Sequence, residues 1–138
     1  MTQLSLTRTH SRRDDGSASL EIAILGPALL LLVFAVVQAG LWFYARSLAL
    51  AAAQEGVAAA RTYEAHGDAG VARARSFLDR AAGDSLQATT VSRVGSTATT
   101  ARVEVRGRAL SVLPGVPGLP VSQAARAPVE RFTVGGGP

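Results

Sequence analysis

Residue types that commonly carry out chemistry are scarce in this sequence. It has two histidines, His10 and His66, no cysteine, and carboxylates that stand singly apart from the neighbouring pair Asp14 and Asp15. Covalent catalysis needs a nucleophile beside a base and an orienting group, and these residues offer no such set, nor a glycine-rich phosphate loop leading into a helix. His66 stands at a predicted turn, where a histidine is usually solvated. We therefore expect no enzymatic activity, no cofactor, no bound metal and no small-molecule substrate.

One acidic residue, Glu21, stands where a charge is unfavourable. It opens an apolar stretch, five positions after Gly16 and behind a basic leader at residues 8–13. An ionisable residue at the margin of a membrane segment is unfavourable unless it is paired, and such residues tend to be functional. Alternatively, Glu21 simply extends to the interface at the start of a helix, where the helix dipole favours a negative charge.

The stretch from Ile22 to Ala45 contains no charged residue and is dense in Leu, Val, Ile, Phe and Ala. About 20 apolar residues suffice to cross a bilayer as a helix, so the sequence predicts a transmembrane segment over about residues 21–45. Trp42, Phe43 and Tyr44 near its end are typical of a membrane interface. The basic leader predicts a cytoplasmic N-terminus and an extracytoplasmic C-terminal part by the positive-inside rule.

Two other interpretations of this segment stay open. The first is a buried core helix, although apolar runs of this length are rare in so small a domain. The second is a secretory signal peptide cleaved after the A-x-A sequence Ala49-Leu50-Ala51. The apolar region of a signal peptide normally spans only about 7–15 residues, so an anchor fits better than a cleaved signal.

The charge of the chain does not indicate a nucleic-acid partner. Its 14 basic residues are all Arg, and the formal net charge is +4. The pairs Arg73/Arg75 and Arg106/Arg108 are interspersed or balanced with acids rather than clustered with aromatic residues, so we expect no nucleic-acid binding. The absence of cysteine excludes disulfides and thiolate metal sites.

The predicted helix continues beyond the apolar stretch, because the following sequence is rich in alanine and free of proline. We expect it to run from about Ala18 to about Ala65, with His66-Gly67-Asp68 as its stop and the next N-cap. Pro27 lies inside this helix and removes one backbone hydrogen bond. A kink or local unwinding is therefore expected near residues 23–27.

Small residues recur along the distal part of this helix. Ala52, Gly56 and Ala60 are spaced four residues apart, so they form one ridge on which another helix could pack closely. The alternative explanation is the alanine bias of the composition.

The remaining sequence predicts a small α+β domain. A second helix is expected between Asp68 and Gly83, because its apolar residues recur at helical spacing: Val71, Ala74, Leu78 and Ala81. A less regular β-rich run covers residues 86–94. The stretch TARVEVRGRAL at residues 100–110 alternates and predicts a half-buried antiparallel strand. One side holds Ala101, Val103 and Val105, and the other holds Arg102, Glu104, Arg106 and Arg108.

A third strand is expected over about residues 121–134, with Pro128 placing it at an edge or breaking it in two. The proline-rich stretch at residues 113–120 is the expected loop between strands two and three. The fold class is thus α+β: a long N-terminal transmembrane helix continues into a small outer domain with a second helix and a short antiparallel sheet of about three strands. The predicted parts are a cytoplasmic leader (1–16), the long helix (17–66), an extracytoplasmic domain (67–134) and a disordered tail (135–138).

The stretch GSASLEIAILGPALLLLVFAVVQAG, which begins at Gly16, resembles the opening of TadE-like pseudopilins of the tight-adherence (Flp) pilus and secretion system. Gly16, Glu21, Pro27 and Gly40 match positions typical of that family, whereas Leu20 replaces its more usual Val or Ala. The resemblance is specific over roughly residues 12–60. Beyond them it rests on the general plan of a helix followed by a short β-rich domain.

This resemblance implies that an aspartic prepilin peptidase cuts between Gly16 and Ser17 and leaves Ser17 with a free α-amine. It also implies that Glu21 meets the N-terminal amine of a neighbouring subunit and so fixes axial register. The implied partners are the lipid bilayer, the prepilin peptidase, other pilin or pseudopilin subunits and the pilus assembly platform, all at the cytoplasmic membrane.

We therefore predict a single-pass, structural minor pseudopilin. A major pilin role fits less well, because Flp pilins resemble a bare helix with little domain after it. The alternative is a membrane-anchored or secreted binding domain unrelated to pili, in which Glu21 is incidental.

Overall fold

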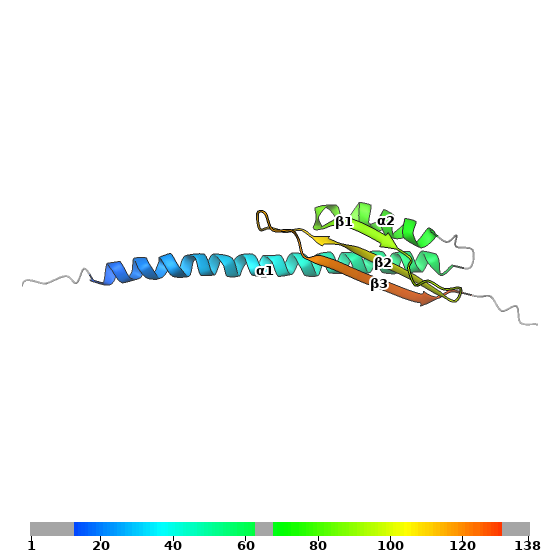
Figure 1. Ribbon diagram of the computed structural model, residues 1–138, viewed down its shortest axis with the longest axis horizontal. Coiled ribbons are helices and arrows are strands. Elements are labelled where there is room, and N and C mark those ends of the chain that lie inside the picture. The colour runs from blue at the N-terminus through cyan, green and yellow to red at the C-terminus, as the bar shows by residue number, and fades with distance from the viewer. Residues whose placement is uncertain (1–12, 63–67, 131–138) are drawn as a thin grey trace, which may run out of the picture. The chain divides into compact units, whose positions relative to one another are not determined.

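The computed structural model describes residues 13–62 and 68–130, with the side chains of the first helix described from Ser19 onward. The chain divides into two compact units, Met1–Ala35 and Val36–Pro138. His10, His66, most of the predicted leader and the predicted tail lie outside the described residues. The elements in chain order are α1 (Arg13–Ala60), α2 (Ala69–Ala81), the 3-10 helix η1 (Gly83–Ser85), β1 (Leu86–Ser92), β2 (Thr100–Ala109) and β3 (Pro120–Pro128) (Figure 1).

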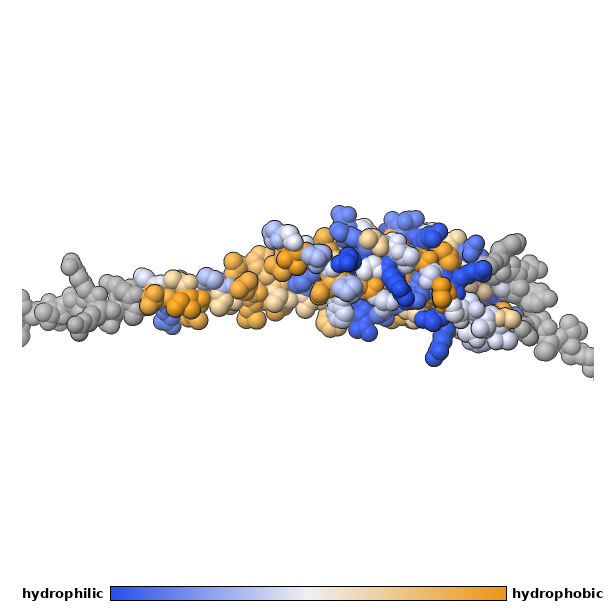
Figure 2. Space-filling model, viewed as in Figure 1, coloured by the Kyte–Doolittle hydropathy of each residue, from blue (hydrophilic) through white to orange (hydrophobic). Residues whose placement is uncertain are grey.

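The described part of the first unit is the N-terminal part of α1. Every side chain from Ser19 to Val33 is exposed, including Leu31, whose exposed fraction is 65%. Apolar residues surround the helix instead of forming one stripe, which is the pattern of a helix that needs an apolar environment on all sides. On the face shown in Figure 2 this part of the helix is predominantly apolar. Among the described residues, α1 is long and apolar enough to cross a membrane, so it is suited to a single-pass anchor.

The bounds of α1 differ from the expected ones. The helix begins at Arg13 rather than near Ala18, and Asp14 and Asp15 favour this early start because acidic residues complement the helix dipole in the first turn. It ends at Ala60, and the expected end near residue 65 lies outside the described residues. The helical backbone continues through Pro27 without interruption, so no unwound segment separates the two sides of the proline.

The second unit contains an antiparallel sheet in the order β1-β2-β3. The alternation in β2 is confirmed, because Ala101, Val103 and Val105 are buried. β3 pairs with β2 along its whole length and ends at Pro128, at the edge of the sheet. Proline is tolerated there because an edge strand needs no further backbone donor. The sheet of three strands and the α+β class are therefore as predicted, with a third strand that is shorter than expected.

Helices α1 and α2 cover the same face of this sheet. A Cβ atom built on Gly56 of α1 would lie 3.0 Å from Cγ1 of Val103, and one built on Gly70 of α2 would lie 3.2 Å from Cγ2 of the same valine. Both helices therefore reach one β2 side chain. The buried core contains many small side chains, with these alanines among its members: Ala45, Ala49, Ala52, Ala53, Ala74, Ala82 and Ala109.

Helix α2 begins and ends near the residues predicted from the sequence, Asp68 and Gly83, but Asp68 does not cap it with its side chain. Asp68 occupies the N-cap position, but its side chain makes no capping hydrogen bond; instead its carboxylate lies 3.6 Å from Arg93. Gly83 has a φ of +47° and follows the C-cap residue Ala82, as expected for a glycine stop. Ala81 is exposed and Ala82 is buried in its place, because the backbone turns into η1 at this point.

Residues 110–119, here called the β2–β3 loop, contain most of the predicted proline-rich stretch. The loop closes tightly at its base, where the backbone N–H of Ala109 donates to the carbonyl of Leu119 at 2.9 Å. A Cβ on Gly118 would overlap the carbonyl oxygen of Ala109, so only glycine fits this position.

Candidate functional site

The expected processing residues, Gly16 and Ser17, lie in the helical backbone at the start of α1. Glycine is less favourable than alanine inside a helix by about 1 kcal/mol. A peptidase that binds an extended segment needs this part of the helix to open, and Gly16 lowers the cost of opening. The arrangement is compatible with cleavage.

Glu21 lies on the exposed apolar part of α1, one helical turn after Ser17. Residues four apart share a helix face, so the carboxylate and the backbone of Ser17 are on the same side. Within the side chains that the structure describes, no ion pair involves Glu21. The described side chains therefore leave the charge of this carboxylate without an ion-pair partner.

Gly26 leaves a shallow apolar hollow on the surface of the same part of α1. A Cβ at Gly26 would meet nothing within 4 Å. The hollow is lined by residues of one helix face: Ile22, Leu25, Gly26, Ala28, Leu29 and Leu32. Its lining is wholly apolar, so it suits a lipid chain or an apolar side chain of another helix and offers no hydrogen bond to a polar ligand.

The small-residue ridge brings α1 and α2 of one chain together. Cβ atoms built on Gly56 and Gly70 would each lie 2.7 Å from the carbonyl oxygen of the other glycine, and the one on Gly70 would also lie 2.8 Å from Cβ of Ala60. Ala52 and Gly56 are buried. Within the second unit, α2 and the sheet therefore occupy this ridge.

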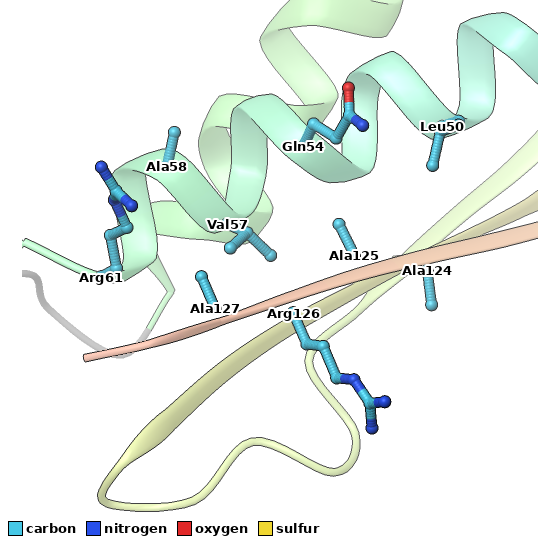
Figure 3. Close-up of a pocket in the computed structure, with 9 residues that line it drawn as sticks. All are labelled: Leu50, Gln54, Val57, Ala58, Arg61, Ala124, Ala125, Arg126 and Ala127. Atoms are coloured by element: carbon cyan, nitrogen blue, oxygen red, sulfur yellow. The ribbon is translucent and has the colours of Figure 1, made fainter.

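A groove runs between α1 and the edge strand β3 (Figure 3). Ala125 and Ala127 point towards the helix and Arg126 points away, as the alternation of a strand requires. Arg61 stands at one end, where its backbone carbonyl accepts a hydrogen bond from the N–H of Glu130 at 3.1 Å. The groove is open, and its small side chains leave room for apolar groups but hold no cluster of ionisable residues suited to catalysis.

The outer face of the sheet carries a charged cluster centred on Glu104. Nε of Arg106 donates to Oε1 at 2.7 Å, Oγ of Ser122 donates to the same oxygen at 3.0 Å, and Nη2 of Arg102 lies 3.8 Å from Oε2. The hydrogen bond from Arg106 holds the pKa of Glu104 below its ordinary value of 4.5, with Ser122 and the charges of both arginines acting in the same direction against burial. Sequence reasoning placed Glu104 on the polar face correctly, but the structure buries it to 9% exposure.

Sequence reasoning missed the polar contacts at the end of the apolar stretch. Nε2 of Gln38 donates to the carbonyl of Leu110 at 3.1 Å, and Oε1 of Gln38 accepts from the N–H of Val112 at 3.1 Å. Nε1 of Trp42 donates to the carbonyl of Pro120 at 3.1 Å. The signal was present, because Gln38 is the one amide side chain between Ile22 and Ala45.

Metal binding has no support in the part of the chain that the structure describes. Across residues 13–62 and 68–130, no group of three or more His, Asp or Glu side chains is placed to hold an ion.

Comparison with known proteins identifies one relationship. Residues 16–58 match the family model described as TadE-like protein, which confirms the predicted resemblance over that stretch. The match begins at Gly16 and includes Glu21, Pro27 and Gly40. No curated protein and no solved structure matches the chain.

Proposed function

We propose that this chain is a TadE-like minor pseudopilin, a membrane-anchored structural subunit in the assembly of a tight-adherence (Flp-type) pilus or related secretion apparatus. The observation that carries the proposal is the extent of the family match, residues 16–58. It starts at the glycine expected to precede the cut and covers the lone acid, the apolar helix and the part of α1 that packs on the sheet. The match and the apolar helix α1 fit a protein associated with this type of pilus.

Glu21 has the central role in the proposed mechanism. A prepilin peptidase removes the leader after Gly16 and creates a free α-amine on Ser17. In the assembly, this amine on one subunit pairs with Glu21 of its neighbour and fixes their axial register. The lone carboxylate on an otherwise apolar surface supports this role, because an unpaired charge there is unfavourable and a cationic partner relieves the penalty.

Glu21 also has a competing partner within its own chain. Ser17 is four residues earlier, so its new amine lies on the same helix face. Pairing within one subunit would neutralise the charge before assembly, whereas pairing between subunits adds free energy to assembly itself. A crosslink that joins residue 17 of one copy to residue 21 of another would identify the second arrangement.

The proposed location follows from the same anchor. The N-terminus faces the cytoplasm, where the peptidase acts and the basic leader is held, and the second unit lies outside the cytoplasmic membrane. Its partners there are other pilin or pseudopilin subunits and the assembly platform. The proposed role of the protein in this assembly is that of a structural subunit.

The N-terminus of protein extracted from membranes of its own host tests the processing step. Edman sequencing and intact mass are expected to give a chain that begins SASLE at Ser17. The Gly16→Leu variant is expected to keep the leader, whereas Gly26→Leu, the same substitution at a helix glycine with open space around it, is expected to be cleaved normally. A parent chain that begins at Met1 would contradict processing, and one that begins near Ala52 would establish secretion in place of anchoring.

The assembly step is tested separately with Glu21→Ala. This variant is expected to be cleaved at Ser17 yet to fail in pilus assembly, measured as shed filaments and surface-attached pili. Glu21→Asp, which keeps the charge on a shorter side chain, is expected to restore part of the assembly. Normal pilus formation by Glu21→Ala would remove the register role from this residue.

A further inference from the structure

The β2–β3 loop is fastened to α1 inside the apolar stretch of the helix. The side-chain amide of Gln38 donates one hydrogen bond to the carbonyl of Leu110 and accepts one from the N–H of Val112. Both its nitrogen and its oxygen are therefore paired with backbone atoms of the loop. Trp42 makes a third bond, to Pro120 at the end of the loop. These contacts all lie within the second unit, so the position of the loop beside residues 38–42 of α1 is fixed.

The level of these contacts on the helix coincides with the expected edge of a bilayer. A hydrocarbon core of about 30 Å takes about 20 helical residues. Counted from Glu21 at one margin, that length ends near Leu41, between Gln38 and Trp42. Ending the span before Gln38 would leave it too short, because Ile22 to Val37 is only about 24 Å of helix at about 1.5 Å per residue. The loop therefore lies at the same depth as the far margin of the membrane.

The loop has the composition of a segment that contacts lipid. No charged residue occurs between Arg108 and Arg126. Val116 and Leu119 expose 52% and 48% of their surface although they are large apolar residues in a connection between strands. Water is a poor environment for such a cluster, and most soluble loops carry polar residues at their tips.

Cations stand next to this apolar segment at the level where lipid phosphates would be. The guanidinium of Arg46 lies 5.6 Å from the ring centre of Trp42, and Nη1 of Arg108 donates to the carbonyl of Gly118 at 3.3 Å. Trp, Arg and exposed apolar residues together are typical of a membrane interface, where the apolar parts enter and the charged groups meet the headgroups.

We propose that the β2–β3 loop is a second membrane contact, in which Val116 and Leu119 enter the outer interface of the bilayer beside the end of the transmembrane helix. The proposal rests on membrane anchoring by α1, but it does not depend on pilus assembly. Lipid is the occupant favoured here, because the apolar loop is fastened beside residues 38–42 of α1, where a span of about 20 residues counted from Glu21 ends. The three bonds to Gln38 and Trp42 remove the polar backbone atoms of the loop from the side that faces the helix, as a segment near hydrocarbon requires.

The absence of native cysteine allows a direct test by site-specific labelling. Val116→Cys is compared with Val94→Cys, which lies in the connection before β2 and is 73% exposed. The two positions hold the same native residue type at opposite ends of β2. Leu30→Cys, in the middle of the apolar helix, reports the anchor itself. Each full-length variant carries an NBD label and is reconstituted into vesicles of phosphatidylcholine with a minor share of phosphatidylglycerol.

Quenching by lipids with a doxyl group near the headgroup is expected to lower the fluorescence of the label at residue 116 at least twofold more than that of the label at residue 94. Aqueous iodide is expected to quench in the opposite order, and emission from residue 116 to shift to shorter wavelength. Equal accessibility to iodide at residues 116 and 94 would overturn the loop contact. A label at residue 116 that is shielded from both iodide and doxyl lipid would also overturn it and point to a protein neighbour.

The label at residue 30 separates this proposal from the anchor on which it rests. Lipid quenching at residue 30 with water exposure at residue 116 would reject the loop contact alone. Iodide quenching at residue 30 would reject the anchor and the loop contact together. As a measurement without substitution, Trp42, the one tryptophan in the chain, is expected to be quenched by brominated lipid; failure of this quenching would contradict the predicted depth.

Discussion

The two parts of α1 differ in which apolar side chains are exposed and which are buried. In the first unit large aliphatic side chains are exposed, for example Leu30 at 57% and Leu31 at 65%. In the second unit the positions of the same helix that are fully buried are alanines, including Ala49 and Ala52 at 0%. The fully buried positions of this helix are therefore small, whereas the large aliphatic side chains of its first part are exposed.

This contrast shows that two different environments shape one continuous helix. Full burial of a leucine side chain contributes about 2 kcal/mol, so the first part requires an apolar environment supplied from outside the chain, such as lipid or neighbouring helices. Alanine contributes little area, but it lets the helix axis approach the sheet and α2, where many close contacts add up. Exposed large side chains thus distinguish the first part of the helix from the part that packs closely against its own fold.

Truncating a leucine in each part is expected to give the largest difference. Leu48→Ala should lower the free energy of unfolding of the second unit by about 3 kcal/mol, because it leaves a cavity in the core. Leu30→Ala should change it by less than about 0.5 kcal/mol, since Leu30 lies in the first unit and 57% of its surface is exposed. Denaturant unfolding in micelles, followed by Trp42 fluorescence, measures both. Equal losses would show that the first part also packs against the fold.

The opposite change, which adds a methyl group to a glycine of α1, also distinguishes the two kinds of position. Gly56→Ala should destabilise the second unit by about 2 kcal/mol, because the new Cβ would lie 2.7 Å from a backbone oxygen that cannot move freely. Gly40→Ala has open space around it and should be neutral or stabilising by up to about 1 kcal/mol. The same unfolding measurement applies. A neutral Gly56→Ala would mean that α1 and α2 can separate without cost.

One glutamate in each unit extends the comparison: Glu104 in the second unit has polar partners, and Glu21 in the first unit lies on an apolar surface. Glu104→Gln should cost about 1 kcal/mol at neutral pH, because it weakens a charge-assisted hydrogen bond. Since the folded pKa of Glu104 is lowered, its contribution is present above 4.5 and is lost as the pH falls through the folded value. Glu21→Gln should leave unfolding of the second unit unchanged. A pH series of unfolding curves on both variants checks this, and a pH-independent difference between parent and Glu104→Gln would contradict it.

The smallest effect is expected from the ion pair that joins α1 to α2 at the surface. Nη2 of Arg73 lies 2.9 Å from Oε2 of Glu55, but both side chains are about half exposed. Arg73→Ala should therefore cost less than about 0.5 kcal/mol, and added salt should abolish the difference. A loss as large as that of Gly56→Ala would mean that charge, and not close packing, holds the two helices together.

The elements with local periodicity were predictable. The alternation along residues 101–108 and the helical spacing of Ala74 and Leu78 each indicate an apolar face, so their patterns predicted β2 and α2 from the sequence. The position of Pro128 likewise predicted an edge. Ala81 and Ala82 were exchanged because a pattern gives the face of a helix but not the residue at which its backbone turns away.

Contacts between distant residues were not predictable from such patterns. Gln38 bonds to residues 72 and 74 positions away, and no local signal connects an amide in an apolar run to a proline-rich loop. The burial of Glu104 depends on side chains of two strands, Arg106 and Ser122, that close over it. The roles expected for Gly16, Ser17 and Glu21 came from resemblance to a family, because their partners are other molecules.

The fastening of the loop to Gln38 and Trp42 has a mechanical consequence. The chain joins α1 to α2 beyond Ala60, at one end of the packed part of α1, and the loop holds the opposite end of that part. A pull on the second unit along the helix is therefore shared between the covalent link and the loop contacts, with the alanine-lined interface loaded in shear between them. Such an arrangement resists tension better than a domain on a single tether, since many contacts must yield together before the sheet peels from its helix.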